Sequence, residues 1–215
     1  MIRKKALIFG ITGQDGSYLA KHLIKKKYSV TGICRRKRFI NLKKLKIFSK
    51  IKIELIKNVE TKKINKILKK NFDEIYFLGG QSSVTNSFKL ESETYESQIK
   101  PLKDILDFIV LQRKKKTKFL YAGSSELFGN INKKKKISEE SFKKPISPYG
   151  LSKLIGYEII KSYRQMYRIP VCTAILFNHE SMLRPKQFIF RKIVDGLNQI
   201  LQNQKYKLHV GNIRI

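Results

Sequence analysis

Residues 6–16 read ALIFGITGQDG, an apolar run followed by a turn with glycines at every third position. The run predicts a buried strand, and the residues from about Gln14 to Lys27 show the periodicity of an amphipathic helix. Glycines at a strand-to-helix turn let the backbone approach a pyrophosphate, which the helix N-terminus attracts. A tight turn without a ligand is the alternative. The position between a strand and a helix favours a dinucleotide-binding site.

The same alternation of strands and helices continues along the chain. Short runs that are apolar on both faces are typical of parallel strands covered by helices. The expected strands are YSVTGIC (28–34), IKIEL (51–55), EIYFLGG (74–80), KFLYAGSS (118–125) and VCTAILF (171–177), with helices near 62–70, 94–113 and 148–167. We therefore predict an α/β fold, a Rossmann-type doubly wound parallel sheet, over residues 1–177.

After Phe177 this alternation stops. FIFRKIVDGLNQIL (188–201) predicts an amphipathic helix, and KLHV (207–210) predicts a short strand. We expect residues 178–215 to begin an incomplete C-terminal substrate-binding portion that is truncated at Ile215. The uncovered apolar side of the helix predicts self-association, so that a homo-oligomer is among the expected states.

The charge is strongly basic, with 47 Lys and Arg against 16 Asp and Glu and a net charge of +31. Lysine runs at 25–27, 114–116 and 133–136 are not interleaved with aromatic residues, as a nucleic-acid stacking surface requires. We expect solvated surface charge and no nucleic-acid partner. Two cysteines are too few for a disulfide scaffold or a zinc cluster, and we predict no metal site. Without a recognisable signal peptide or membrane span, we expect a cytoplasmic protein with no membrane partner.

Two arginines, Arg35 and Arg36, follow the second expected strand. An NAD enzyme usually places a carboxylate there for the ribose 2′-hydroxyl. The missing acid and the basic pair together predict NADP as the cofactor, although a basic pair is common in so basic a chain.

A second group of polar residues lies near the fifth expected strand and the helix after it. Tyr149 and Lys153 are four residues apart and share one face of that helix. A tyrosine acts as a base at neutral pH when a nearby cation stabilises its anion. Ser124 and Glu126 follow the strand, at the sheet edge where such folds bind ligands. Singly each residue has an ordinary surface or capping role; together they form a set able to oxidise an alcohol and move a proton from carbon.

The chain contains, in order, the segments GITGQDGSYL (10–19), GICRR (32–36), LGGQSSV (78–84), SSELFG (124–129), SPYGLSK (147–153), ILFNHES (175–181) and FIFRKI (188–193). With these segments it resembles the GDP-mannose 4,6-dehydratase family of the extended short-chain dehydrogenases. The resemblance implies that Ser124, in place of the family's threonine, Glu126, Tyr149 and Lys153 are catalytic. The implied cofactor contacts are Gly10, Ile11, Thr12, Gly13, Gln14, Asp15, Gly16, Arg35, Arg36, Asn58, Val59, Leu78, Gly79, Gly80, Gln81, Ser82, Tyr149, Lys153, His179 and Arg184. The implied substrate contacts are Ser83, Ser124, Glu126, Asn178 and Lys192.

Several positions depart from the family pattern. Asn58-Val59 replace an Asp-Leu pair, Glu93 stands where the family has a tyrosine before a helix, and 182–185 differ from the usual Pro-Arg-Arg-Gly. The family also continues beyond the GN of residues 211–212 into further substrate-binding segments.

The reaction that the resemblance implies is the dehydration of GDP-mannose to GDP-4-keto-6-deoxymannose, in deoxyhexose biosynthesis, with NADP returned unchanged. Tyr149 would remove the O4 proton and Glu126 the C5 proton. One alternative is another nucleotide-sugar epimerase or reductase, which Glu126 disfavours because a simple reductase needs no C5 base. A second is a non-catalytic NADP-binding remnant. A third is nucleic-acid binding through the positive charge, which a steep salt dependence of affinity would reveal.

Overall fold

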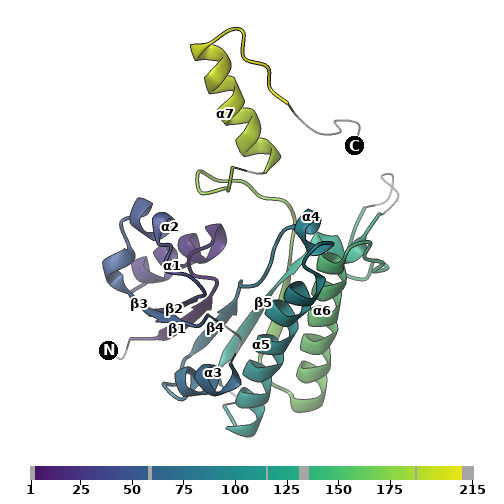
Figure 1. Ribbon diagram of the computed structural model, residues 1–215. Coiled ribbons are helices and arrows are strands. Elements are labelled where there is room, and N and C mark those ends of the chain that lie inside the picture. Colours follow the sequence, from purple (N-terminus) through teal and green to yellow (C-terminus); the bar gives the residue numbers. More distant parts are fainter. Residues whose placement is uncertain (1–2, 58–59, 115, 131–135, 187, 210–215) are drawn as a thin grey trace. The chain divides into compact units, whose positions relative to one another are not determined.

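The computed structural model describes residues 3–57, 60–114, 116–130, 136–186 and 188–209. The chain divides into two compact units, residues 1–177 and residues 178–215 (Figure 1). The larger unit contains the sheet, and the described part of the smaller one contains a single long helix. None of the described helices is both long and apolar enough to cross a membrane.

The sheet of the larger unit has six parallel strands in the order β3-β2-β1-β4-β5-β6 (Figure 1). The order reverses between β1 and β4, the neighbouring strands from which the chain winds outward in opposite directions. This arrangement confirms the predicted doubly wound sheet. The strands are β1 (Lys5–Phe9), β2 (Ser29–Cys34), β3 (Ile51–Leu55), β4 (Glu74–Phe77), β5 (Lys118–Ser124) and β6 (Val171–Leu176).

The helices follow the strands in alternation, as predicted. They are α1 (Gln14–Lys25), α2 (Ile40–Lys44), α3 (Thr61–Leu68), α4 (Val84–Ser87), α5 (Glu91–Leu111), α6 (Pro148–Tyr167) and α7 (Ile189–Gln202), with short 3₁₀ turns η1 (Phe48–Lys50) and η2 (Ser125–Phe128). Helix α5 begins three residues earlier than expected, so Glu93 lies inside its first turn. Acidic side chains are favoured there because the helix dipole is positive at its N-terminus.

Successive side chains of β1 point to opposite faces of the sheet and into two separate apolar clusters. Leu7 and Phe9 pack with residues of α3, α5 and α6, whereas Ala6 and Ile8 pack with residues of α1 and α2. Helices therefore cover both faces of the sheet (Figure 1). The edge strands β3 and β6 have partly exposed side chains. Each of them pairs with one neighbouring strand, and its side chains are less completely buried than those of the central strands.

Three local features differ from the expectations. No helix was expected between the strands at 28–34 and 51–55, but α2 lies there, because Leu42 is fully buried in the core. The fourth strand ends at Phe77, since Gly80 adopts a φ of +112°, which a regular strand cannot accommodate. The described part of KLHV, residues 207–209, is not a strand; the described part of the smaller unit offers no other strand to pair with it.

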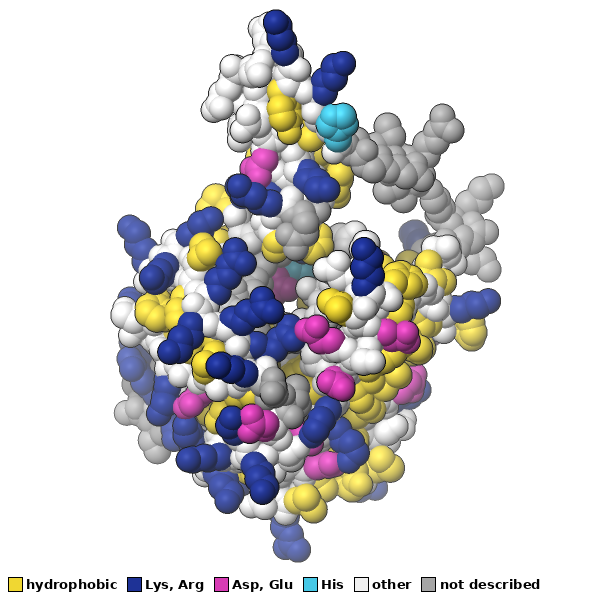
Figure 2. Space-filling view, viewed as in Figure 1, with side chains coloured by type: hydrophobic (Ala, Val, Ile, Leu, Met, Phe, Trp, Pro, Cys, Tyr) yellow, Lys and Arg dark blue, Asp and Glu magenta, His cyan; other side chains and the backbone are white. Residues whose placement is uncertain are grey.

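On the face of the larger unit seen in Figure 2, basic side chains are widely distributed, with fewer acidic ones among them. Lysine and arginine side chains spread in this way are typical of a solvated surface.

Candidate functional site

The glycine turn between β1 and α1 packs directly against the loop that follows β4. Gly10 has a φ of +81°, and a Cβ atom added there would lie 2.7 Å from the carbonyl oxygen of Leu78. At Gly16 an added Cβ would lie 2.3 Å from the carbonyl oxygen of Gly10. Both positions need glycine, because the backbone itself fills the space a side chain would take. The N-cap of α1 is Gly13, which has no side chain to block the helix end.

Helix α2 holds the glycine turn from its other side. The side-chain amide of Asn41 donates a hydrogen bond of 3.0 Å to the carbonyl oxygen of Thr12. Ser17, one turn into α1, donates through its hydroxyl to the carbonyl oxygen of Ile11, also at 3.0 Å. These bonds hold the turn in place at the N-terminus of α1, a position that attracts phosphate groups in folds of this kind.

The loop after β4, residues 78–82, is anchored to helix α5. The backbone N–H of Gln81 donates to the Ser97 hydroxyl at 3.1 Å, and its carbonyl oxygen accepts from the Gln98 side-chain amide at 2.8 Å. Gln98 also packs beneath Gly80, where an added Cβ would lie 2.5 Å from its Nε2 atom. The two loops thus meet at the carboxyl ends of β1 and β4, where the strand order reverses and folds of this kind bind nucleotides.

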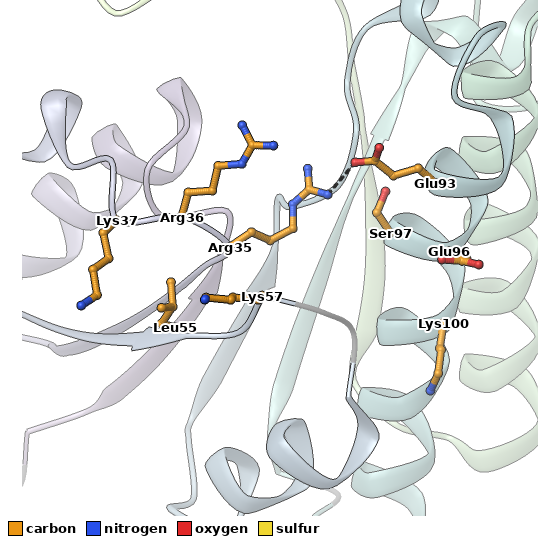
Figure 3. Close-up of a pocket in the computed structure, with 9 residues that line it drawn as sticks. All are labelled: Arg35, Arg36, Lys37, Leu55, Lys57, Glu93, Glu96, Ser97 and Lys100. Carbon is orange, nitrogen blue, oxygen red and sulfur yellow. Dashed lines mark hydrogen bonds and ion pairs between the residues drawn. The ribbon is translucent and has the colours of Figure 1, made fainter.

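A pocket of about 1140 Å³ lies beside these loops, at the carboxyl end of β2 (Figure 3). Arg35 and Arg36 line it, as does Glu93 from the first turn of α5. The Arg35 guanidinium points toward Glu93, and its Nη1 atom lies 2.9 Å from the Glu93 carboxylate. The pocket could hold the adenosine end of a dinucleotide, with the two arginines available to a 2′-phosphate.

The predicted catalytic pair begins helix α6. Ser147 caps the helix by accepting a 3.0 Å hydrogen bond from the N–H of Gly150, and Pro148 occupies the first turn, where it is favoured. The Lys153 ammonium lies 5.6 Å from the centroid of the Tyr149 ring, one turn away. The expected proximity of these two side chains on one helical face is therefore present.

Lys153 is buried, with its Nζ atom donating to the Ala122 carbonyl at 2.8 Å and to Gln98 Oε1 at 3.0 Å. Both acceptors are uncharged. Loss of water on burial lowers the pKa of Lys153 from its usual 10.5 to about 7. The lysine can thus gain or lose a proton near neutral pH, and an anion beside it would favour its charged form.

Ser124 and Glu126 lie next to this helix. Ser124 is buried at the end of β5, and its hydroxyl accepts a 3.3 Å hydrogen bond from the Glu126 N–H as the cap of η2. The carbonyl oxygen of Glu126 faces the first turn of α6, 2.7 Å from where a Cβ on Gly150 would lie. The backbone thus places η2 against the turn that carries Tyr149. Ser124 has the capping role considered from its sequence, and its hydroxyl hydrogen can still be donated to a ligand.

Gln98 was not among the predicted site residues, although it joins the loop after β4 to Lys153. The sequence carries one signal for it. The buried face of α5 runs through Thr94, Gln98, Leu102 and Ile105, and a glutamine on such a face needs a polar partner inside the protein.

Several other predicted residues lie elsewhere. His179, Arg184, Asn178 and Lys192 belong to the smaller unit. There Arg184 Nε lies 3.2 Å from a carboxylate oxygen of Glu180, and its guanidinium lies 3.6 Å from the centroid of the Phe188 ring. Asn58 and Val59 lie outside the described residues.

Comparison with known proteins adds to this geometry. The family model described as GDP-mannose 4,6 dehydratase matches residues 7–215. The chain belongs to this family. It is 38% identical to a GDP-mannose 4,6-dehydratase of Vibrio cholerae over 99% of its own length and 60% of the relative's. It is 36% identical to the GDP-mannose 4,6 dehydratase of Drosophila melanogaster, over 98% of the chain and 56% of the relative. This member of the GDP-mannose 4,6-dehydratase family thus spans about 60% of the length of the curated relatives it matches.

Solved structures agree with the fold. The chain superposes on a dTDP-glucose 4,6-dehydratase from Bacillus anthracis, determined in complex with NAD, with a TM-score of 0.79 and 16% identity. The match covers 91% of this chain and 62% of that one. At this identity the likeness establishes the Rossmann-like fold of the chain.

Proposed function

We propose that this chain carries the cofactor-binding and proton-transfer machinery of a GDP-mannose 4,6-dehydratase, with NADP as its cofactor. One observation carries the proposal: the buried Lys153 lies beside Tyr149 at the sheet edge that also holds the glycine turn. Glu126, on the neighbouring turn, adds the carboxylate that a dehydration needs and that a simple oxidation or reduction does not.

The cofactor would lie across the carboxyl ends of β1 and β4. The glycine turn, Gly10 to Gly16, would hold the pyrophosphate, and residues 78–82 would follow the chain of the dinucleotide. Arg35 and Arg36 would bind the 2′-phosphate. Once bound, the nicotinamide supplies the ability to take up a hydride and give it back. His179 and Arg184 of the smaller unit are further proposed cofactor contacts.

Each catalytic residue would have a distinct role. Tyr149 would take the proton from O4 of the mannose, and the positive charge of Lys153 would stabilise the resulting phenolate. Ser124 would donate a hydrogen bond to O4. Glu126 would remove the proton from C5 and deliver one to the departing C6 hydroxyl, so that water is released. Ser83, Asn178 and Lys192 are the remaining proposed substrate contacts.

The test is to incubate the purified chain with NADP and GDP-mannose and to follow the 6-deoxy-4-keto product by mass spectrometry. In deuterated water the product should carry one deuterium at C5. Tyr149→Phe and Glu126→Gln should each lower the rate by about 10²–10⁴-fold, because each removes a group that moves a proton. Glu158→Gln, at an exposed position of α6, serves as the control for loss of a carboxylate.

The outcomes separate the alternatives. Binding of NADPH without turnover would support a non-catalytic dinucleotide-binding protein, and a product epimerised without loss of water would support an epimerase. An undiminished rate in Glu126→Gln would contradict the role of that carboxylate.

A further inference from the structure

The pocket at the end of β2 contains an ion pair between two parts of the chain that are far apart in sequence. Arg35 follows β2 and Glu93 lies in the first turn of α5, yet Arg35 Nη1 lies 2.9 Å from Glu93 Oε1 (Figure 3). About half of each side chain is exposed, 49% in both cases. Both residues are therefore accessible to a ligand that enters the pocket.

The other charges in the pocket show why this pair matters. Arg36, Lys37, Lys57 and Lys100 also line it, and Glu96 is its second acid. Lys100 pairs with Asp104 on its own helix at 3.0 Å. Arg35 is the cation whose guanidinium points at a pocket carboxylate, so a phosphate that enters has to compete with Glu93 for it.

We infer that Glu93 is a specificity-determining residue. It competes with the 2′-phosphate of NADP for Arg35 and so reduces the preference of this pocket for NADP over NAD. The inference rests on the proposed function, because it assumes that the pocket receives the adenosine end of a nicotinamide dinucleotide. It concerns the position where the sequence departs from the tyrosine of the family pattern.

The two cofactors make opposite demands on the pair. A 2′-phosphate offers Arg35 a bidentate partner. To bind it, the guanidinium must either leave Glu93 or contact both anions at once, and in both cases the Glu93 carboxylate then faces the negative charge of the phosphate. A ribose 2′-hydroxyl carries no charge, so Arg35 and Glu93 can stay paired, and the carboxylate can accept a hydrogen bond from the hydroxyl. Glu93 thus disfavours the phosphorylated cofactor and tolerates the other.

The size of the effect follows from the exposure of the pair. Half-exposed ion pairs are weak because water and salt screen them, and Arg36 remains available to the phosphate. Glu93 should therefore reduce the NADP preference by about fivefold rather than reverse it.

The experiment measures binding rather than turnover. Fluorescence titration with NADPH and NADH gives the ratio of their affinities, and calorimetry with adenosine 2′,5′-bisphosphate and adenosine 5′-monophosphate repeats it without the nicotinamide. Glu93→Gln should raise both ratios about fivefold, mainly through tighter binding of the 2′-phosphorylated ligand. Glu96→Gln, one turn along α5 in the same pocket, is the matched control for loss of one negative charge and should raise them less than twofold.

A double-mutant cycle tests whether Glu93 acts through Arg35. In an Arg35→Ala background, the Glu93→Gln change should alter either ratio less than twofold, because the contested guanidinium is gone. Equal effects of the Glu93 and Glu96 changes, no effect of Glu93→Gln, or an undiminished effect in Arg35→Ala would each overturn the inference. If the unmutated protein binds none of the four ligands, the proposed function itself is wrong. If it binds them and only the ratios fail to respond, the inference about Glu93 is wrong and the proposed function stands.

Discussion

The Nζ atom of Lys153 lies 3.0 Å from Oε1 of Gln98, and this uncharged amide links the lysine to the loop after β4. Its other acceptor is the carbonyl of Ala122, also uncharged. A lysine that loses water and gains only neutral partners binds its proton weakly in the folded protein. The relationship makes the stability of the fold depend on pH in a defined direction.

Between pH 7 and pH 10.5 the unfolded chain should hold a proton on Lys153 that the folded chain releases. The free energy of unfolding should therefore rise with pH in this window, by at most about 1.4 kcal/mol per pH unit. We expect the difference in this free energy between the wild type and Lys153→Met, measured by urea denaturation, to increase from pH 7 to 10 in favour of the wild type. A difference that stays flat would show that Lys153 remains charged inside the fold.

Gln98→Glu should remove this dependence. A carboxylate at the position of Oε1 would raise the pKa of Lys153, because an opposite charge within hydrogen-bonding distance stabilises the ammonium. In the Gln98→Glu background, the proteins with and without Lys153→Met should differ in their free energy of unfolding. That difference should change by less than about 0.5 kcal/mol per pH unit over the same range. Gln98→Met, which adds no charge, should keep the rise seen in the wild type. Retention of the full rise in Gln98→Glu would argue against a direct contact between the two side chains.

Gly13 and Gly16 should respond differently to alanine, although both lie in the glycine turn. At Gly16 the added Cβ would lie 2.3 Å from a backbone oxygen, whereas at Gly13 its nearest neighbour would be 3.3 Å away. Gly16→Ala should lower the free energy of unfolding by about 1–3 kcal/mol, and Gly13→Ala by less than about 0.5 kcal/mol. Both should weaken NADPH binding more than about tenfold, since a methyl group on either residue disturbs the pyrophosphate site. Equal stability losses would contradict the packing at Gly16.

Tyr121 should tolerate loss of its hydroxyl. The side chain is fully buried, and within the described part of the chain its oxygen has no hydrogen-bond partner; burial also raises its pKa. Tyr121→Phe should raise the free energy of unfolding by about 1 kcal/mol, because an unsatisfied buried hydroxyl is costly. Tyr163→Phe is the matched control, and it should lower stability by a similar amount because the Tyr163 hydroxyl donates to Asp107. Thermal unfolding of the three proteins at one pH distinguishes these results.

The fold could be predicted because its signals are local. Each strand is a short stretch of suitable length rich in apolar residues, and the glycine spacing marks the turn after β1. The proximity of Tyr149 and Lys153 followed from the helical period alone. Such features depend on neighbours in sequence, which one sequence displays.

The other parts of the site depend on contacts between distant residues. Gln98 reaches Lys153 across 55 positions, and Arg35 reaches Glu93 across 58. Nothing local distinguishes Glu93 from the other exposed acids of α5, so its pairing with Arg35 could not be foreseen. The prediction of a strand was wrong over the described residues 207–209 for the same reason, because a strand forms only where a neighbour can pair with it.

The contact between Gly10 and the Leu78 carbonyl also bears on how this protein could be re-engineered. The turn after β1 and the loop after β4 are separated by more than sixty residues of sequence, but each occupies space that the other would need in order to change shape. A chimera that received only one of these segments from a distant relative would bring together two surfaces that had not been fitted to each other. The two segments should therefore be exchanged as a pair.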